Sequence, residues 1–426
     1  MSRSRNTSKT SLNRVLDSKL QRRDFLKRMA LTGVAVAGMP HVGRFVWAQN
    51  AVSPSDVIAG KIEPMIIHND QTGVLETPLE LLREDRITPK DRLYIRNNQI
   101  LEPEGRTIES VEDPGWVVQI DGLVQYTKAV QLADLADMEN SEVEMVLQCS
   151  GNGRSFYAQA IQTRGTQWQH GGMGNVVFGG VPLRTLFESF DPELGVHANA
   201  KFLTVQGADS PTGTASDFEH SVPLDYALEH AMLATHMNGE PIPGAHGGPV
   251  RFVIPGYYGT MNVKWVNRIR FDAVETNNYN QIPRYREPIE PIEPGTDFTF
   301  TFDNSIPNWN QKVKSVIFGP LAGESLSTGQ VEVRGVAWND GMTGIEAVQV
   351  STDGGTSWTN AEIETPDSPY AWYHWSATVS LDSGEQTIIS RAIDKKGRAQ
   401  PLDGTIDWNP SGYSWNGADH VTVEVA

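Results

Sequence analysis

The stretch Leu147-Gln148-Cys149-Ser150-Gly151-Asn152-Gly153-Arg154 contains the only cysteine of this 426-residue chain. Residues 143–147, just before it, are rich in Val, Met and Leu, and this composition predicts a buried strand. The Gly-Asn-Gly sequence that follows predicts a turn. The thiol of Cys149 is therefore expected at the C-terminal end of a strand, beside the cation Arg154. We expect this setting to lower the pKa of the thiol and to prepare it for binding a metal.

A single thiol limits the chemistry that is open to the chain. Disulfides, iron–sulfur clusters, structural zinc sites and covalently attached haem all need more cysteines than one. From the residues alone, three interpretations of Cys149 remain. It is a buried thiol that packs as a small hydrophobic group, a catalytic nucleophile, or a one-thiolate ligand to a metal held mainly by another group.

The first residues predict an export signal rather than part of the fold. Residues 21–27, Gln-Arg-Arg-Asp-Phe-Leu-Lys, place two arginines directly before an apolar stretch at 29–39. Val-Trp-Ala at 46–48 offers a small residue for cleavage, and the apolar stretch is too short and Gly-rich to span a bilayer. The order of residues favours a twin-arginine signal over 1–48, rather than an ordinary basic amphipathic N-terminus. We therefore expect a periplasmic protein, exported folded through the Tat translocase with a cofactor already inserted.

Removing that segment makes the charge more negative. Residues 1–48 carry seven Arg, three Lys and two Asp, a net of +8, so residues 49–426 carry −25 against −17 for the whole chain. Such an acidic protein is not expected to bind nucleic acid or an anionic membrane, whereas a basic protein such as a small cytochrome suits it. The alternative is that the charge serves only solubility.

The length that remains after residue 48 predicts two domains. Residues 283–295 are rich in Pro and Glu and predict an extended linker. Before the linker, strands are expected at 116–120 and 201–205 and a helical stretch at 224–237, among many Gly-containing loops. This mixture predicts an α+β domain over 49–290, with a site built from loops.

The second domain, residues 296–426, is expected to be all-β. Apolar and polar residues alternate at 331–338 and at 346–350, and turn sequences separate successive runs. Roughly seven short strands in this length are typical of an immunoglobulin-like sandwich. The turn sequences lie at 339–341, 353–355 and 396–397.

Several motifs in order along the chain resemble those of the sulfite oxidase family. The Cys149 segment resembles the family's active-site segment, whose cysteine binds molybdenum. Asn98 and Asn262 stand where the family usually has His. The other matching segments are Tyr94-Ile95-Arg96-Asn97-Asn98, Trp168 with Gly171-Gly172-Met173-Gly174-Asn175, His246-Gly247-Gly248-Pro249-Val250-Arg251, and Asn262-Val263-Lys264-Trp265.

The resemblance implies a molybdenum–molybdopterin cofactor. In the family, the two sulfurs of one pterin dithiolene, oxo or hydroxo groups and one cysteine thiolate hold the metal, and a soft thiolate suits it. Cys149 is the implied metal ligand, and Arg251 and Lys264 are the cations expected at the pterin's phosphate. The other residues that the resemblance assigns to the cofactor are Tyr94, Arg96, Asn97, Asn98, Asp209, His246, Asn262 and Val263.

The resemblance also implies a substrate pocket for sulfite, which is a dianion around neutral pH and needs cations to bind. Arg96 and Arg154 match family arginines in that pocket, and Trp168 matches a residue that lines it. Counting 21 residues from Lys264 reaches Tyr285, which matches a family tyrosine that supports oxo transfer. The usual Asp before this tyrosine is Arg284 here. The alternative for Tyr285 is an aromatic linker residue that packs between the two domains.

The function implied is a periplasmic sulfite dehydrogenase that oxidises sulfite to sulfate. The chain has no Cys-x-x-Cys-His and no segment resembling a cytochrome b5 domain. We therefore expect no haem in this chain and electron transfer to an external c-type cytochrome. Two alternatives are a family member that acts on protein-bound sulfane or an S-oxide, and a non-enzymatic module built on the sandwich.

The C-terminal sandwich resembles the family's dimerisation domain, so a homodimer joined through 296–426 is expected. Residues 408–415, Trp-Asn-Pro-Ser-Gly-Tyr-Ser-Trp, supply residue types that are typical of interface anchors. The alternative is that these aromatic residues fill the sandwich core or pack on the first domain.

Overall fold

In the computed structural model, the unit that carries the strands and helices described below begins at Val52. The predicted twin-arginine signal at 1–48 lies outside the residues described, and the domain boundary near 283–295 remains a prediction. Within the described ranges, no helix is long and apolar enough to cross a membrane. The structure describes residues 52–99, 101–110, 112–190, 192–209 and 217–426.

Cys149 directly follows the edge strand of an antiparallel sheet. Residues 145–148 of this strand are buried and a turn follows them, so the predicted buried strand and turn are confirmed. Main-chain pairing with the next strand extends to the last residue, Gln148, which lies opposite Met173. In spatial order the strands are β10 (Glu240–Pro241), β9 (Met232–Met237), β6 (Met173–Pro182) and β5 (Ser141–Gln148), with β11 (Arg251–Val253) also paired with β9.

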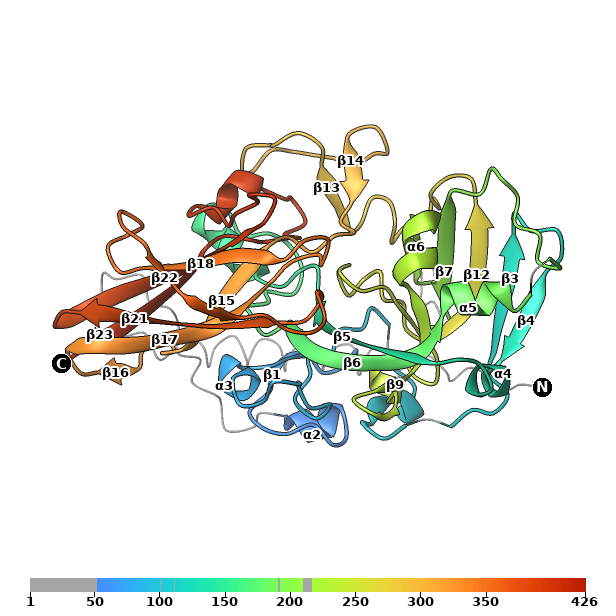
Figure 1. Ribbon diagram of the computed structural model, residues 1–426, viewed down its shortest axis with the longest axis horizontal. Helices are drawn as coiled ribbons and strands as arrows, with labels where there is room; N and C mark the ends of the chain where they lie inside the picture. Colours follow the sequence, from blue (N-terminus) through green and yellow to red (C-terminus); the bar gives the residue numbers. More distant parts are fainter. Residues whose placement is uncertain (1–51, 100, 111, 191, 210–216) are drawn as a thin grey trace, which may run out of the picture. The chain divides into compact units, whose positions relative to one another are not determined.

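A second sheet supports the largest hydrophobic core. Its strands, in spatial order, are β4 (Lys128–Gln131), β3 (Val117–Gly122), β12 (Val266–Asp272), β7 (Phe202–Gly207) and β8 (Glu219–Pro223). The strands expected at 116–120 and 201–205 are confirmed as β3 and β7. Both pair with β12, which runs parallel to β3 and antiparallel to β7. The helices α5 (Leu183–Glu188) and α6 (Leu224–His230) lie beside this sheet in Figure 1.

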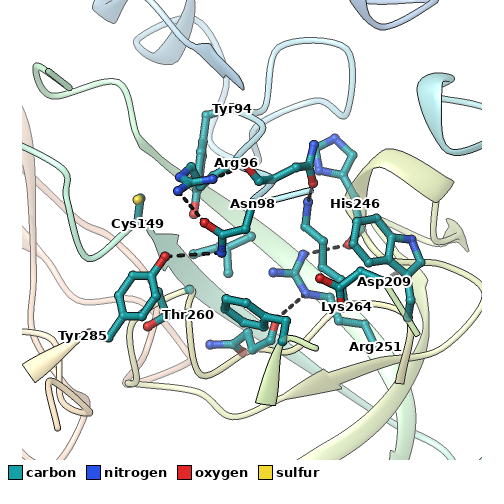
Figure 2. Close-up of a pocket in the computed structure, with 16 residues that line it drawn as sticks. Tyr94, Arg96, Asn98, Cys149, Asp209, His246, Arg251, Thr260, Lys264 and Tyr285 are labelled. Carbon is teal, nitrogen blue, oxygen red and sulfur yellow. Dashed lines mark hydrogen bonds between the residues drawn. The ribbon is translucent and has the colours of Figure 1, made fainter. Parts of the chain in front are cut away.

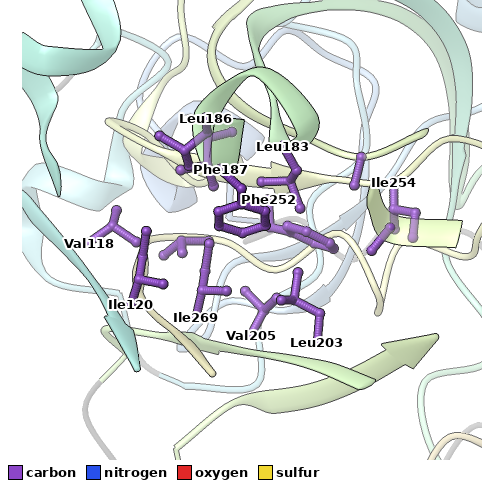
Figure 3. Packing of buried hydrophobic residues seen from close by; sticks show 14 of the residues in the cluster. Val118, Ile120, Leu183, Leu186, Phe187, Leu203, Val205, Phe252, Ile254 and Ile269 are labelled. Carbon is purple, nitrogen blue, oxygen red and sulfur yellow. The ribbon is translucent and has the colours of Figure 1, made fainter. Parts of the chain in front are cut away.

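Side chains from the sheet, from α5 and from β11 meet in that core (Figure 3). Phe187 of α5 lies with its ring centroid 5.1 Å from that of Phe271 on β12. The burial of these apolar side chains holds β11 and β12 in place on either side of the loop at 254–265, which carries site residues. The core includes Val118, Ile120, Leu183, Leu186, Phe187, Leu203, Val205, Phe252, Ile254 and Ile269.

The C-terminal residues form two sheets that share one core, as the all-β prediction requires. The immunoglobulin-like assignment remains a prediction. The first sheet orders β15 (Lys314–Gly319), β17 (Gly329–Trp338), β21 (Tyr373–Leu381) and β20 (Glu362–Glu364). The second orders β16 (Ser325–Leu326), β23 (Asp419–Val425), β22 (Gly384–Asp394), β18 (Ile345–Ser351) and β19 (Thr359–Asn360).

Short elements connect these sheets, and several of them carry site residues. β1 pairs with β2, and β13 pairs with β14. Their bounds are α2 (Pro54–Val57), β1 (Ile66–Asn69), β2 (Val74–Glu76), α3 (Leu79–Leu82), η1 (Pro103–Arg106), α4 (Leu132–Ala136), η2 (Arg154–Gln159), η3 (Gly244–His246), β13 (Arg286–Pro288), β14 (Ser305–Pro307) and η4 (Gly404–Asp407).

Two local predictions are wrong. The helix expected over 224–237 ends at His230, and the second half of that stretch is β9. β9 is paired on both sides, by β6 and β11, and this tertiary pairing outweighs the helix propensity of its Met, Leu and Ala residues. The linker expected over 283–295 contains β13, and Arg286 within it is buried and forms an ion pair with Glu275.

Candidate functional site

A cavity opens beside the end of β5, and Cys149 faces it (Figure 2). Its empty volume is about 660 Å³, the opening to solvent included, which is within the range of pockets that bind cofactors. Residues from segments far apart in the sequence line it, and most of the predicted site residues are among them. These are Tyr94, Arg96, Asn97, Asn98, Cys149, Asp209, His246, Arg251, Asn262, Lys264 and Tyr285.

The turn after β5 holds Cys149 by its main chain. The Cys149 N–H donates to Gly172 O at 2.8 Å, and the Asn152 N–H donates to Cys149 O at 2.9 Å. Gly153 adopts a left-handed φ of 89°, and a Cβ atom there would lie 2.6 Å from the ring of Trp415. Glycine is therefore required at 153 both for the backbone conformation and for close packing.

The lowered thiol pKa that we expected from the sequence is wrong. Burial raises the pKa of the Cys149 thiol, and the nearby cations Arg96 and Arg154 oppose this shift without overcoming it. The side chain is only 7% exposed, so the cost of desolvating a thiolate outweighs the attraction to the arginines. A cationic partner that binds the sulfur directly, such as a metal ion, would favour the thiolate.

Arg96, Asn98 and Tyr285 come together at the Cys149 end of the cavity, as Figure 2 shows. Asn98 Oδ1 accepts a hydrogen bond from Arg96 Nη2 at 2.6 Å, and Asn98 Nδ2 donates to the Tyr285 hydroxyl at 3.4 Å. Tyr285 is buried, and its φ of 51° is uncommon for a residue other than glycine. Burial raises the pKa of Tyr285, but the charges of Arg284 and Arg96 and the hydrogen bond with Asn98 lower it, and the net shift is downward.

Tyr285 also stacks on an aromatic residue of the C-terminal region. The ring centroids of Tyr285 and Tyr413 are 4.9 Å apart, with 26° between the ring planes. Tyr285 therefore both lines the cavity and packs on the C-terminal region, while its part in oxo transfer stays a prediction.

A second group of cations lies at the opposite end of the cavity (Figure 2). Arg251 Nη1 donates to His246 O at 2.8 Å, and Lys264 Nζ donates to Asn97 Oδ1 at 2.8 Å. Burial lowers the pKa of Lys264, and repulsion from Arg251 lowers it further. Asp209 lies nearby, and its buried Oδ1 atom has no hydrogen-bond partner.

These cations lack carboxylate partners. In the part of the chain that the structure describes, neither Arg96 nor Arg251 nor Lys264 forms an ion pair. Partly or fully buried charges without counter-charges are costly, so a cavity with cations at both ends suits an anionic ligand.

Comparison with known proteins gives the family. Residues 105–280 match the oxidoreductase molybdopterin binding domain, and residues 306–425 match the Mo-co oxidoreductase dimerisation domain. Mitochondrial sulfite oxidase of Mus musculus is 30% identical over 421 residues, covering 92% of this chain and 74% of that protein. The chain belongs to the sulfite oxidase family. As a member of this family it is an oxidoreductase, and its family implies a molybdopterin cofactor.

Other members of the sulfite oxidase family and a solved structure are also similar. The mitochondrial sulfite oxidase of Homo sapiens is 31% identical over 366 residues, 82% of this chain and 64% of that protein. Among solved structures, the sulfane dehydrogenase SoxCD of Paracoccus pantotrophus is 26% identical. That match covers 93% of this chain and 99% of the other, with a TM-score of 0.69.

The site residues fit the cofactor that the sulfite oxidase family implies. The described residues contain no group of three or more His, Cys, Asp and Glu side chains that could hold a metal ion, so a metal beside Cys149 needs other ligands. A dithiolene cofactor brings such ligands with it. The cations Arg251 and Lys264, which form no ion pair within the described ranges, fit a phosphate group.

Three residues that the family resemblance selected do not line the cavity: Arg154, Trp168 and Val263. Arg154 Nε donates to Ser411 O at 3.1 Å and Nη1 donates to Thr166 O at 2.9 Å, while the guanidinium lies over the Tyr413 ring. The anion-binding role of Arg154 therefore stays a prediction.

Trp168 and Val263 are buried elsewhere around the site. Trp168 is fully buried and packs edge-on against Tyr94, with ring centroids 5.8 Å apart. Val263 belongs to the largest core. Asn262 lines the cavity, but its amide is engaged by the main chain, because Oδ1 accepts from the Ile254 N–H at 2.9 Å.

Lys61 is a residue at the site that the sequence did not indicate. It is buried, and its Nζ donates to the main-chain oxygen of Leu93, the residue before Tyr94, at 2.6 Å. The same Nζ lies 3.3 Å from His246 Nε2. Burial lowers the pKa of Lys61 to about 7, with Asp91 opposing. No motif surrounds this lysine, and 185 residues separate it from His246, so a local pattern could not have found it.

Lys61 does not line the cavity itself, and the lining residues that sequence reasoning missed are Leu147, Phe218, Gly259, Thr260 and Trp265. Leu147 and Trp265 stand inside segments that resemble family motifs, so they could have been included. Phe218 and Thr260 lie between motifs and carry no such signal. The Gly259 N–H donates to Gln148 O at 2.6 Å, which ties the 254–265 loop to the end of β5.

The interface role suggested for residues 408–415 is wrong. Trp408 and Trp415 are 4% and 3% exposed, and both rings pack edge-on against Tyr157 within the same chain. The alternative, packing on the first domain, is the one observed. As a result, the C-terminal residues pack directly on Tyr285, through Tyr413, and on Gly153, through Trp415.

Proposed function

We propose that this enzyme oxidises sulfite to sulfate with a molybdenum–molybdopterin cofactor bound in the cavity beside Cys149. The balanced reaction takes sulfite and water to sulfate, two protons and two electrons. When bound, the cofactor supplies the oxygen transfer and accepts the two electrons. The observation that carries the proposal is the cavity itself, which combines a single thiol with cations at both ends that form no ion pair with any residue the structure describes.

The chain's own residues divide into two groups along the cavity. Cys149 would bind the metal, because it is the only thiol and it faces the cavity. Arg251 and Lys264, at the far end, would bind the cofactor's phosphate. Arg96, beside Cys149, would bind the substrate anion, and the Tyr285 hydroxyl would donate to it.

The location and the electron acceptor also belong to the proposal. The Arg-Arg-x-Phe-Leu-Lys order at 22–27 supports export to the periplasm through the Tat translocase. The net charge of −25 on residues 49–426 supports transfer of electrons to a basic c-type cytochrome. The match of 306–425 to a dimerisation domain supports a homodimer, with an immunoglobulin-like sandwich at its interface.

A second candidate is oxidation of a protein-bound sulfane. It is favoured by the similarity to the sulfane dehydrogenase SoxCD, whose solved structure matches over 93% of this chain.

The deciding experiment is a steady-state assay of the purified holoenzyme with cytochrome c as electron acceptor. Sulfite is compared with a protein carrying a cysteine-bound sulfane at matched concentration. We expect sulfite to reduce cytochrome c rapidly and the sulfane-carrying protein to reduce it only slowly. Reduction by the sulfane protein alone would establish the second candidate instead.

A further inference from the structure

Arg96, which lines the cavity, and Arg284, which is not among the lining residues, meet on the amide of Asn98 at the Cys149 end of the cavity. Asn98 Oδ1 accepts from Arg96 Nη2 at 2.6 Å and from Arg284 Nη2 at 3.4 Å. Arg284 Nη2 also lies 3.4 Å from the Tyr285 hydroxyl, to which Asn98 Nδ2 donates at the same distance. One asparagine therefore places two guanidinium groups beside the hydroxyl that lines the cavity.

Arg284 carries an uncompensated charge. Among the residues that the structure describes, its partners are amides and tyrosines: Asn280 Oδ1 at 3.1 Å, Asn98, and the side chains of Tyr279, Tyr285 and Tyr413. Its side chain is half-buried, so solvent screens the charge only in part. The other charged group that meets the same amide is also a cation, Arg96. Two neighbouring arginines without a carboxylate repel each other and attract an anion.

Arg154 is less free to take part. Two of its N–H groups already donate to main-chain carbonyls of Ser411 and Thr166, and its guanidinium is stacked on Tyr413. Its planar fork is therefore used by the protein. Arg284 donates to Asn280 Oδ1 at 3.1 Å through Nη1, but the contacts of its Nη2 to Asn98 and Tyr285 are both 3.4 Å long. An arriving oxyanion can replace those long contacts with shorter ones.

We propose that Arg96 and Arg284 form the anion-binding pair of the substrate site, held side by side by Asn98, and that the pair selects doubly charged oxyanions over singly charged ones. The assignment to substrate rests on the proposed function. The selection follows from charge, because a dianion gains about twice as much as a monoanion from each added cation at equal distance. Arg284 is thus a specificity residue for a small dianion.

The test measures binding of sulfate, a non-reacting dianion, and of nitrate, a monoanion, to the holoenzyme by calorimetry. We compare wild type with Arg284→Gln and Arg284→Lys. Arg391→Gln is the matched control, because Arg391 is also half-buried, stacks on Trp358 and bonds an amide oxygen, that of Gln349. A charge-assisted hydrogen bond predicts about ten- to hundredfold weaker sulfate binding in Arg284→Gln.

Nitrate binding should weaken much less in Arg284→Gln, and Arg284→Lys should restore most of the preference for sulfate. Arg391→Gln should bind both anions as wild type does. In turnover, Arg284→Gln should raise KM for sulfite by a similar factor while kcat changes little, a split that a merely structural defect would not produce.

Sulfate binding within twofold of wild type in Arg284→Gln would overturn the proposal, as would an equal loss for sulfate and nitrate. If Arg284→Gln does not fold, Asn98→Ala decides, because it removes the amide that aligns the two arginines. Unchanged sulfate binding in that variant would also overturn the proposal. A third outcome separates the two proposals. If Arg284→Gln loses sulfate binding but the wild-type enzyme does not oxidise sulfite, the anion-binding pair of Arg96 and Arg284 is supported and only the proposed function is rejected.

Discussion

Replacing Lys314 with Met should make the free energy of unfolding less dependent on pH above neutrality. Lys314 lies on β15 and is 1% exposed, and its Nζ donates to Trp415 O at 2.9 Å and to Asn152 O at 3.4 Å. No ion pair of Lys314 occurs in the described ranges of the chain. Burial lowers the pKa of Lys314 from 10.5 to about 7, with Asp419 opposing the shift.

The sign follows from the protons bound in each state. Between pH 7 and 10.5 the unfolded chain keeps the Lys314 proton while the folded protein releases it. Unfolding therefore takes up a proton, and the folded state becomes more stable as pH rises through this window. With these two pKa values, the lysine adds about 2 kcal/mol of stability between pH 7 and pH 9. Below pH 7 both states are charged and the full cost of burying the ammonium remains.

The assay is urea unfolding followed by tryptophan fluorescence at pH 7, 8 and 9. Between pH 7 and pH 9, the free energy of unfolding of wild type should rise by about 2 kcal/mol more than that of Lys314→Met. The lost hydrogen bonds to Trp415 and Asn152 change the variant's stability at every pH, so only the slope is compared. Lys396→Met, at an exposed lysine, serves as control and should follow wild type. If the free energies of unfolding of wild type and Lys314→Met change in parallel with pH, the pKa of Lys314 is not lowered in the folded protein.

Three further outcomes are expected. Cys149→Ser should abolish sulfite oxidation while circular dichroism stays that of wild type, because a hydroxyl is a poor ligand for a soft metal; retained turnover contradicts the ligand role. Arg96→Gln should raise KM for sulfite by about ten- to hundredfold in steady-state kinetics, since a charge-assisted contact of about 1.5–3 kcal/mol is lost; an unchanged KM speaks against a substrate anion there. Light scattering should give the mass of a dimer for the full-length protein at micromolar concentration, and a monomer mass would exclude the proposed assembly.

Local sequence patterns predicted the parts of the structure that local interactions control. The buried strand and turn around Cys149 follow from a short apolar run that stops at Gly-Asn-Gly. The all-β character of the C-terminal residues follows from alternation and Gly-containing turns, such as that at 353–355. The motif residues at 94–98 and 246–264 meet at one cavity, as the family resemblance implies.

The features that sequence missed depend on contacts between distant segments. Residues 232–237 form a strand because two other strands pair with them, and their own composition does not show this. The Cys149 thiol pKa rises because the surrounding fold removes water, an effect that a neighbouring arginine in the sequence cannot reveal. Arg154 is not among the residues that line the cavity, and it donates to Ser411 O, which lies 257 residues later in the chain.

The most direct test of the central claim is X-ray absorption at the molybdenum edge, comparing wild type with Cys149→Ser. Purified wild-type enzyme should contain molybdenum, and this molybdenum should have one more sulfur neighbour than in Cys149→Ser. The extra neighbour is the Cys149 thiolate, which would bind beside the sulfurs of the cofactor. An equal number of sulfur neighbours in the two proteins would contradict Cys149 as the metal ligand. A wild-type enzyme purified without molybdenum, from cells that make the cofactor, would contradict the account as a whole.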